Sequence, residues 1–190
     1  MTHELMFICG GAWSGKTSRA VKLADSHPNV VWLGTASPAL PLLKERVQTL
    51  QAERPRHWQH IESPFDLPEA VTKAHQEDTN SIFVIDSLSQ WISNEIAKKS
   101  SRMDDRQLLD TMNRDIDDCV NAITNCLAKR PVIIVSADFG QSMPPQIAAD
   151  RTLRMCVGGS NTRFAMISDR MEVVMAGVVI YHKSNQSPKS

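Results

Sequence analysis

The chain has 190 residues, enough for one α/β domain with a well-buried core. Lysine plus arginine and aspartate plus glutamate both number 21, which argues against a broad basic surface for nucleic acid or for an anionic membrane. The apolar stretches are too short to span a bilayer and no basic segment leads into a signal core, so we expect a cytoplasmic protein. Residues 1–183 are expected to form one domain, and residues 184–190 a polar tail.

The first predicted strand is the apolar run over residues 5–9, and a glycine-rich loop follows it directly. The loop reads Gly10-Gly11-Ala12-Trp13-Ser14-Gly15-Lys16-Thr17, which is the spacing of a phosphate-binding loop. Glycines in such a loop let backbone N–H groups point at phosphate oxygens, and the next helix adds its positive N-terminal end. Lys16 would neutralise the β and γ phosphates, and the Thr17 hydroxyl would bind Mg²⁺. The alternative is a glycine-rich turn that binds nothing.

The remaining elements predict a mostly parallel sheet flanked by helices. A helix over residues 18–26 and a strand over residues 30–34 complete a βαβ unit, which implies parallel strands and a right-handed crossover. Further strands are expected over residues 58–61, 82–85, 132–135, 171–175 and 178–181, and further helices over residues 42–52, 68–75 and 104–129.

Asp86 follows four apolar residues at the end of a predicted internal strand. P-loop proteins place the acid that orients Mg²⁺ at this position, where it reaches the metal through a residue such as Thr17 or through water. The alternative is a helix N-cap, because a helical segment follows Asp86. We favour the metal role, since a carboxylate that ends a fully apolar strand needs a reason for its charge.

The four cysteines are scattered and form no Cys-x-x-Cys pair. They lie in apolar or helical surroundings, where a reduced core residue is commoner than a metal ligand or a disulfide. We therefore expect free, buried side chains at Cys9, Cys119, Cys126 and Cys156.

The segment from Val84 to Asn94, Val-Ile-Asp-Ser-Leu-Ser-Gln-Trp-Ile-Ser-Asn, resembles a strand-and-helix motif of one enzyme family. This is the bifunctional adenosylcobinamide kinase/adenosylcobinamide-phosphate guanylyltransferase family of cobalamin biosynthesis. The P-loop also resembles the family's loop, and the similarity covers about residues 5–183. Other residues that fit the family's order are Gly34-Thr35-Ala36, Arg46-Val47, Arg54-Pro55, Trp58, Gly140, Pro145, Arg151, Arg154, Gly158, Asn161, Arg163 and Ala176-Gly177.

The resemblance implies a RecA-like P-loop NTPase fold and a kinase that phosphorylates the aminopropanol hydroxyl of adenosylcobinamide with ATP or GTP. Family members then transfer GMP from GTP through a guanylylated histidine, and they are trimers with active sites between subunits. Thr17 and Asp86 would hold Mg²⁺. The triphosphate would be bound by Gly10, Gly11, Ala12, Trp13, Ser14, Gly15, Lys16, Thr17 and Ser18.

Leu50 stands where the family carries its nucleophilic histidine. Leucine has no lone pair to attack a phosphorus atom, and the neighbouring Thr49 would need a base to do so. We therefore expect the guanylyl-transfer step to be impaired. His57 and His60 flank Trp58 on a predicted strand, where core or surface histidines are the commoner explanation.

Further departures touch the nucleotide site. Trp13 replaces the family's P-loop arginine and could stack on a base or bury against a partner subunit. Asp138, where the family has glutamate, could hold metal-bound water or accept a proton from a substrate hydroxyl, and a turn-forming role stays open.

Three arginines, Arg151, Arg154 and Arg163, are candidates for neutralising charge during phosphoryl transfer, with solvated surface arginines as the alternative. The predicted catalytic set is Lys16, Asp86, Asp138 and Arg154.

Three functions fit the sequence. The first is a kinase of the cobinamide type that binds a small-molecule substrate. The second is a relative that acts as kinase or nucleotidyltransferase on another small molecule, which the altered residues 38–52 favour. The third is a nucleotide-binding regulatory protein without transferase activity, against which Lys16, Thr17 and Asp86 count.

Overall fold

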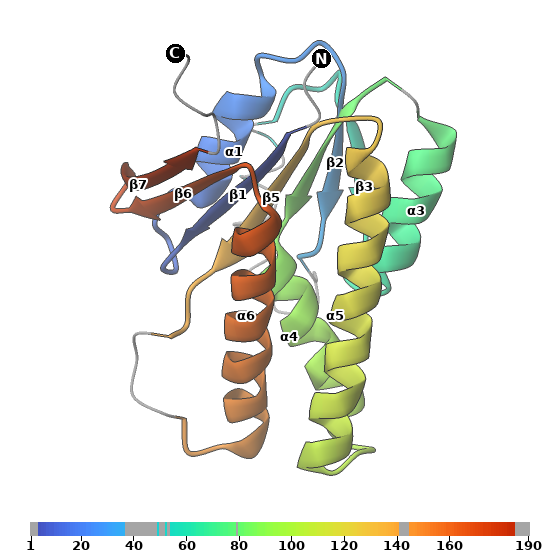
Figure 1. Ribbon diagram of the computed structural model, residues 1–190, viewed down its shortest axis with the longest axis vertical. Helices are drawn as coiled ribbons and strands as arrows, with labels where there is room; N and C mark the ends of the chain where they lie inside the picture. Colours follow the sequence, from blue (N-terminus) through green and yellow to red (C-terminus); the bar gives the residue numbers. More distant parts are fainter. Residues whose placement is uncertain are drawn as a thin grey trace.

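The computed structural model describes residues 4–36, 49, 52, 54–78, 80–140 and 145–184. These residues form a seven-stranded sheet with helices on both faces (Figure 1). The strand order is β3-β2-β4-β5-β1-β6-β7, and neighbouring strands are parallel except for the antiparallel pair β6 and β7. The α/β class and the mostly parallel sheet expected from the sequence are confirmed.

The predicted strands fall within two or three residues of their structural bounds, as do the helices that start near residues 18, 68 and 104. The strands are β1 (Leu5–Gly10), β2 (Val30–Gly34), β3 (Gln59–Glu62), β4 (Ile82–Asp86), β5 (Val132–Ala137), β6 (Arg170–Met175) and β7 (Val178–Ser184). The helices are α1 (Lys16–Ala24), α3 (Leu67–Glu77), α4 (Leu88–Lys99), α5 (Asp105–Leu127) and α6 (Ala148–Ile167). The helix expected over residues 42–52 lies outside the described residues except for Thr49 and Ala52, and so does the expected tail except for Ser184, which belongs to β7.

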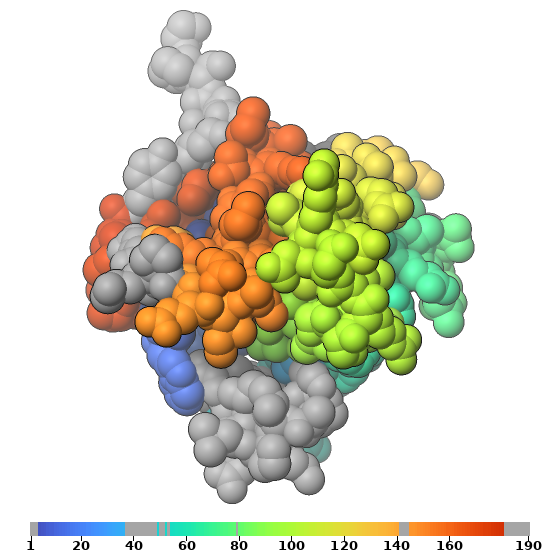
Figure 2. Space-filling view, turned by 90° about the horizontal axis from the view of Figure 1, so that it is seen from below, coloured from blue at the N-terminus to red at the C-terminus, as the bar shows by residue number. Residues whose placement is uncertain are grey.

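The central strands are buried on both faces, which explains their continuous apolar sequences. One face, with Phe7, Phe83 and Ile134, packs against α3, α4, α5 and α6. The opposite face, with Ile8 and Trp32, packs against α1 and Trp58. Figure 2, seen from below, shows the beginnings of α5 (yellow-green) and α6 (orange) side by side at one end of the molecule.

All four cysteines are free and buried, as expected from their surroundings. Burial raises the pKa of Cys9 to about 11, and the nearby charge of Asp138 acts in the same direction. None of the helices in the described ranges is both long and apolar enough to cross a lipid bilayer.

The carboxyl ends of the parallel strands meet at one edge of the sheet, where α/β proteins bind their ligands. The P-loop follows β1 there, while Asp86 ends β4 and Asp138 follows β5. The topology therefore brings the P-loop, Asp86 and Asp138, which span 128 positions of sequence from Gly10 to Asp138 (138 − 10), to the same edge.

The turn between β6 and β7, the two strands that follow β1 in the sheet order, contacts the P-loop. Ala176 and Gly177 both have positive φ, 49° and 81°, and the Gly177 N–H donates to the Ser14 carbonyl at 2.7 Å. A Cβ atom on Gly10 would lie 2.2 Å from the Val174 carbonyl oxygen. A side chain at Gly10 would push the hairpin away from the loop, so this close approach requires glycine.

Candidate active site

The P-loop carries Lys16 at the first position of α1. Gly15 precedes the helix with φ at 100°, a conformation that side chains other than hydrogen disfavour. The Lys16 ammonium donates to the Gly11 carbonyl at 2.5 Å and to Ser14 Oγ at 3.4 Å. The charge of Lys16 thus lies over the loop itself, together with the positive N-terminal end of α1.

Thr17 and Asp86 meet beside this loop. The Thr17 hydroxyl donates to Asp86 Oδ1 at 3.3 Å, across 69 residues of sequence. The N-cap of α4 is Ser87, whose hydroxyl accepts from the Gln90 N–H at 3.3 Å, so the helix-cap alternative for Asp86 is wrong. A hydroxyl and a carboxylate are oxygen ligands of the kind that Mg²⁺ takes in P-loop proteins, and their contact fits such an ion.

Arg54 pairs with the other oxygen of the same carboxylate. Its Nη2 lies 3.6 Å from Asp86 Oδ2, and its guanidinium carbon lies 4.2 Å from the centre of the Trp32 ring. Trp32 stacks in turn on Trp58, with ring centres 5.8 Å apart. Burial lowers the pKa of the Arg54 guanidinium, while the charges of Asp86 and Glu62 oppose that shift.

Hydrogen bonds fix the strand ends around Asp86. The Thr35 hydroxyl donates to the Ser87 carbonyl at 2.7 Å and accepts from the Ser87 N–H at 2.8 Å. The buried Asn94 amide donates to the carbonyls of Thr35 and Pro64, at 2.8 and 2.9 Å. These contacts explain why the segment from Val84 to Asn94 combines a strand, a polar turn and a helix.

Asp138 lies immediately after β5, next to the P-loop. Its N–H donates to the Gly10 carbonyl at 2.9 Å, and its Oδ1 accepts from the Gly140 N–H at 2.8 Å. The second contact is the hydrogen bond of the turn-forming alternative, and it also fixes the orientation of the carboxylate. Asn161 on α6 holds the end of β5 by donating to the Ala137 carbonyl at 2.9 Å.

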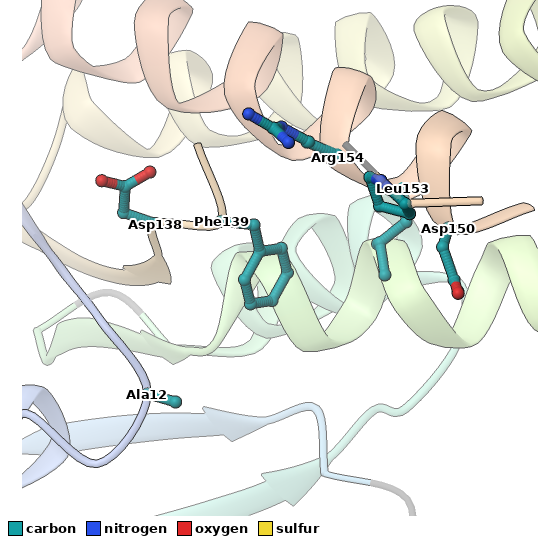
Figure 3. A pocket seen from close by; sticks show the side chains of 7 residues that line it. Ala12, Asp138, Phe139, Asp150, Leu153 and Arg154 are labelled. Atoms are coloured by element: carbon teal, nitrogen blue, oxygen red, sulfur yellow. The ribbon is translucent and has the colours of Figure 1, made fainter. Parts of the chain in front are cut away.

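A cavity of about 490 Å³ opens between the P-loop and the first turns of α6. Figure 3 shows Asp150, Leu153 and Arg154 on α6, with Ala12 of the P-loop across from them and the Phe139 ring between. Arg154 also donates to the Gly140 carbonyl at 2.6 Å. The lining residues combine apolar walls with two carboxylates and one guanidinium: Ala12, Asp138, Phe139, Pro145, Asp150, Leu153 and Arg154.

Among the described residues, the other candidates do not line this cavity. Arg163 pairs with Asp117 of α5 at 2.6 Å, and Arg151 donates to backbone carbonyls before α6. Neither is among the residues that line the cavity. His57 and His60 are exposed, and Trp13 is 75% exposed in a left-handed conformation with φ at 60°. Leu50, which the resemblance matches to the family's nucleophilic histidine, lies outside the described residues.

Two parts of the site carry little or no signal in the sequence. Arg54 was matched to the family only as part of an Arg-Pro pair, and nothing local links it to Asp86, 32 residues away (86 − 54). Phe139 and Asp150 carry a weak signal, since Phe139 follows Asp138 directly and Asp150 precedes Arg154 by one helical turn.

The sequence is similar to those of known proteins over most of its length. A sequence model of the family described as cobinamide kinase / cobinamide phosphate guanyltransferase matches residues 6–181. The bifunctional adenosylcobalamin biosynthesis protein CobU of Salmonella typhimurium is 26% identical over 179 residues, which cover 92% of this chain and 97% of that protein. The bifunctional adenosylcobalamin biosynthesis protein CobP of Pseudomonas aeruginosa is 28% identical over 174 residues, with 90% and 92% covered.

Among solved structures, an ATPase from a bacterial type III secretion system is similar with a TM-score of 0.55 and 12% identity. The match covers 90% of this chain and 51% of that one. Because the identity is only 12%, the match shows the fold alone. The structural likeness supports the P-loop NTPase fold, and the family match extends over nearly all the residues described above. This chain belongs to the cobinamide kinase / cobinamide phosphate guanyltransferase family.

Proposed function

We propose that this protein is a kinase that phosphorylates the aminopropanol hydroxyl of adenosylcobinamide, with ATP or GTP as the donor. The observation that supports this most directly is the cavity beside the P-loop, because it joins a phosphate-binding loop to Asp138 and Arg154. An acceptor hydroxyl in this cavity would lie next to the end of a bound triphosphate. Positioning of this kind supplies much of the rate of phosphoryl transfer.

The donor is bound by the P-loop, residues 10–18. Its backbone N–H groups and Lys16 hold the phosphates, and Thr17 with Asp86 would hold Mg²⁺. When bound, Mg²⁺ neutralises the phosphate oxygens on which negative charge develops. Trp13 offers an aromatic face at the mouth of the loop, where a purine base could stack.

In the transfer step, the acceptor hydroxyl oxygen forms a bond to the γ-phosphorus while the bond to the β,γ-bridging oxygen breaks. The hydroxyl proton passes to the Asp138 carboxylate, and the nucleoside diphosphate leaves. Arg154 faces the same cavity and stabilises the charge on the transferred group. The hydrogen bond from the Gly140 N–H to Asp138 Oδ1 holds the base in place.

The guanylyl-transfer step is impaired in this proposal because Leu50 replaces the nucleophilic histidine. We also propose a cytoplasmic trimer. Exposed apolar side chains near the end of α6 and on the β6–β7 hairpin support contact between subunits, and these are Met166, Ile167, Met175, Val178 and Ile180.

The kinase is tested with γ-labelled ATP or GTP, Mg²⁺ and adenosylcobinamide. We expect label in the acceptor, and a rate lower by about 100-fold for Asp138→Asn, which keeps the shape but loses the base. Asp150→Asn is the matched control in the same cavity, and it should change the acceptor KM more than kcat. A folded protein that binds MgATP but transfers no phosphate would contradict the proposal.

The guanylyl step is tested separately with α-labelled GTP. No covalent adduct is expected for the wild type, whereas Leu50→His restores a side chain that can attack the α-phosphorus. A stable adduct on the wild-type protein would show that another nucleophile has taken over the role.

A further inference from the structure

One carboxylate at the end of β4 is held from two sides. Asp86 Oδ1 accepts from the Thr17 hydroxyl at 3.3 Å, and Asp86 Oδ2 lies 3.6 Å from Arg54 Nη2. The Asp86 side chain is only about 11% exposed. Its orientation is therefore set by protein contacts rather than by water.

Arg54 is itself placed rigidly. Its guanidinium lies over the Trp32 ring, Trp32 stacks on Trp58, and the Arg54 side chain is about 6% exposed. A flat guanidinium on an aromatic face keeps one plane, which fixes the direction in which Nη2 points.

The other donors of Arg54 find no hydrogen-bond partner among the described residues. Both Nε and Nη1 are buried and unsatisfied there, so the contact with Asp86 is the only ion pair that the guanidinium makes within that part of the chain. A buried ion pair is a weak source of stability compared with apolar packing. Stability alone therefore does not account for a buried arginine at this point.

We infer that Arg54 is a positioning residue that orients the Asp86 carboxylate, so that Oδ1 faces Thr17 and the divalent cation of the bound nucleotide. The inference rests on the proposed function, because that function gives Thr17 and Asp86 their metal. In this role Arg54 acts through Asp86 rather than by contacting the phosphates or the acceptor. Removing a group that orients metal ligands in this way typically weakens metal affinity by about 10- to 100-fold.

The test measures Mn²⁺ binding, by electron paramagnetic resonance, to the full-length protein in complex with a non-hydrolysable ATP analogue. Arg54→Met should weaken Mn²⁺ binding about tenfold and leave metal-free nucleotide affinity within about twofold of the wild type. Arg54→Lys keeps the charge but loses the flat fork, so it should recover part of the loss. Should Arg54→Met fail to fold, a partial loss in Arg54→Lys carries the test.

Arg130→Met is the matched control. Arg130 is also buried, lies 4.3 Å from the centre of the Phe83 ring and pairs with an aspartate, but it belongs to the opposite end of the sheet. Measured at a temperature where circular dichroism shows it folded, this variant should bind Mn²⁺ like the wild type.

Unchanged Mn²⁺ affinity in Arg54→Met, or an equal loss of metal-free nucleotide affinity, would overturn the inference. Failure of the proposed function is a different result. In that case the wild type binds the metal–nucleotide complex but phosphorylates no acceptor, and the role of Arg54 can still be measured. A wild type that binds no Mn²⁺ with the analogue would overturn both.

Discussion

The two ends of the sheet each contain a buried arginine, and the two arginines are built alike. Arg54, near the carboxyl ends of the strands, stacks on Trp32 and lies 3.6 Å from Asp86. Arg130, which precedes β5 at the amino ends, stacks on Phe83 and lies 3.4 Å from Asp78. In both pairs the guanidinium side chain is at most 6% exposed.

The hydrogen bonds around the two pairs differ. Arg130 donates to the backbone carbonyls of Asp78 and Ser81, and the Asp78 carboxylate accepts from Asn80 and Ser81 in the same turn. Burial acts to raise the pKa of Asp78, but the hydrogen bonds of Ser81 and Asn80 and the charge of Arg130 together hold it below its ordinary value. Asp86 instead contacts Thr17 of the P-loop, a residue that we propose as a ligand of Mg²⁺. An arginine–aspartate pair thus closes a turn at one end of the sheet and lies in the candidate site at the other end.

The largest expected effect is that of a substitution near the carboxyl ends of the strands, and it should change activity but not stability. Lys16→Ala removes the ammonium that the proposed function places on the β and γ phosphates, so we expect kcat/KM for phosphate transfer to fall by at least about 1,000-fold. Lys22→Ala, in the exposed last turn of the same helix, should stay close to the wild type. Label transfer from γ-labelled nucleotide measures both. If the Lys16 variant keeps substantial transfer, the carboxyl end is not the site.

The second effect is that of a substitution at the amino ends of the strands, and it should change stability but not nucleotide binding. Arg130→Met leaves the carbonyls of Asp78 and Ser81 without their buried donor, so we expect a loss of about 3 kcal/mol in the free energy of unfolding. Nucleotide affinity, measured by calorimetry on the folded variant, should not change. Urea denaturation checks the stability. A variant that is stable but binds nucleotide weakly would abolish the distinction between the two ends.

The sequence could predict those residues of the candidate site that directly follow a recognisable strand in the chain. Apolar runs of four to six residues mark β1, β4 and β5, and a loop of fixed spacing or a single acid follows each run. Because parallel strands align their carboxyl ends, Thr17, Asp86 and Asp138 could be placed at one edge without coordinates.

What the sequence could not predict depends on packing between distant segments. Arg54 reaches Asp86 only because β2 lies beside β4 and presents Trp32 as a support. Similarly, α6 is 20 residues long although Gly158 and Gly159 fall in its middle, because its Cys156, Val157 and Phe164 pack on the sheet. Tertiary burial outweighs the weak helix propensity of glycine at those positions.

A third, smaller effect concerns a buried charge between the two ends. Glu172 on β6 accepts from Arg19 of α1 at 2.7 and 2.8 Å and from Arg170 at 2.6 Å. These contacts, the hydrogen bonds from Arg19 first, lower the pKa of Glu172 against the opposing effect of burial. A lowered pKa stabilises the fold at pH above the ordinary value of 4.5, and this stabilisation is lost as the pH falls through the lowered value.

We therefore expect Glu172→Gln to lose about 2 kcal/mol of unfolding free energy at pH 7, and the difference from the wild type to shrink as the pH falls below 4.5. Denaturation at several pH values measures this. Glu77→Gln, at an exposed position of α3, should remain within about 0.5 kcal/mol throughout. A difference that does not depend on pH would mean that packing, rather than charge, holds Glu172.

The smallest effect compares two glycines and should have opposite signs. Gly177 has φ at 81° in the turn that supports the P-loop, so Gly177→Ala should cost about 1 kcal/mol. Gly159 lies inside α6, and a Cβ there meets no described atom within 4 Å, so Gly159→Ala should stabilise the protein by about 0.5–1 kcal/mol.

Thermal unfolding of the two alanine variants separates backbone strain at the site from ordinary helix propensity. Because the Gly177 N–H donates to the Ser14 carbonyl, the Gly177 variant should also bind nucleotide more weakly, whereas the Gly159 variant should not. If both substitutions stabilised the protein and neither changed nucleotide binding, the β6–β7 turn would have no part in holding the P-loop. The supports of the site would then be limited to Thr17, Arg54 and the strand ends.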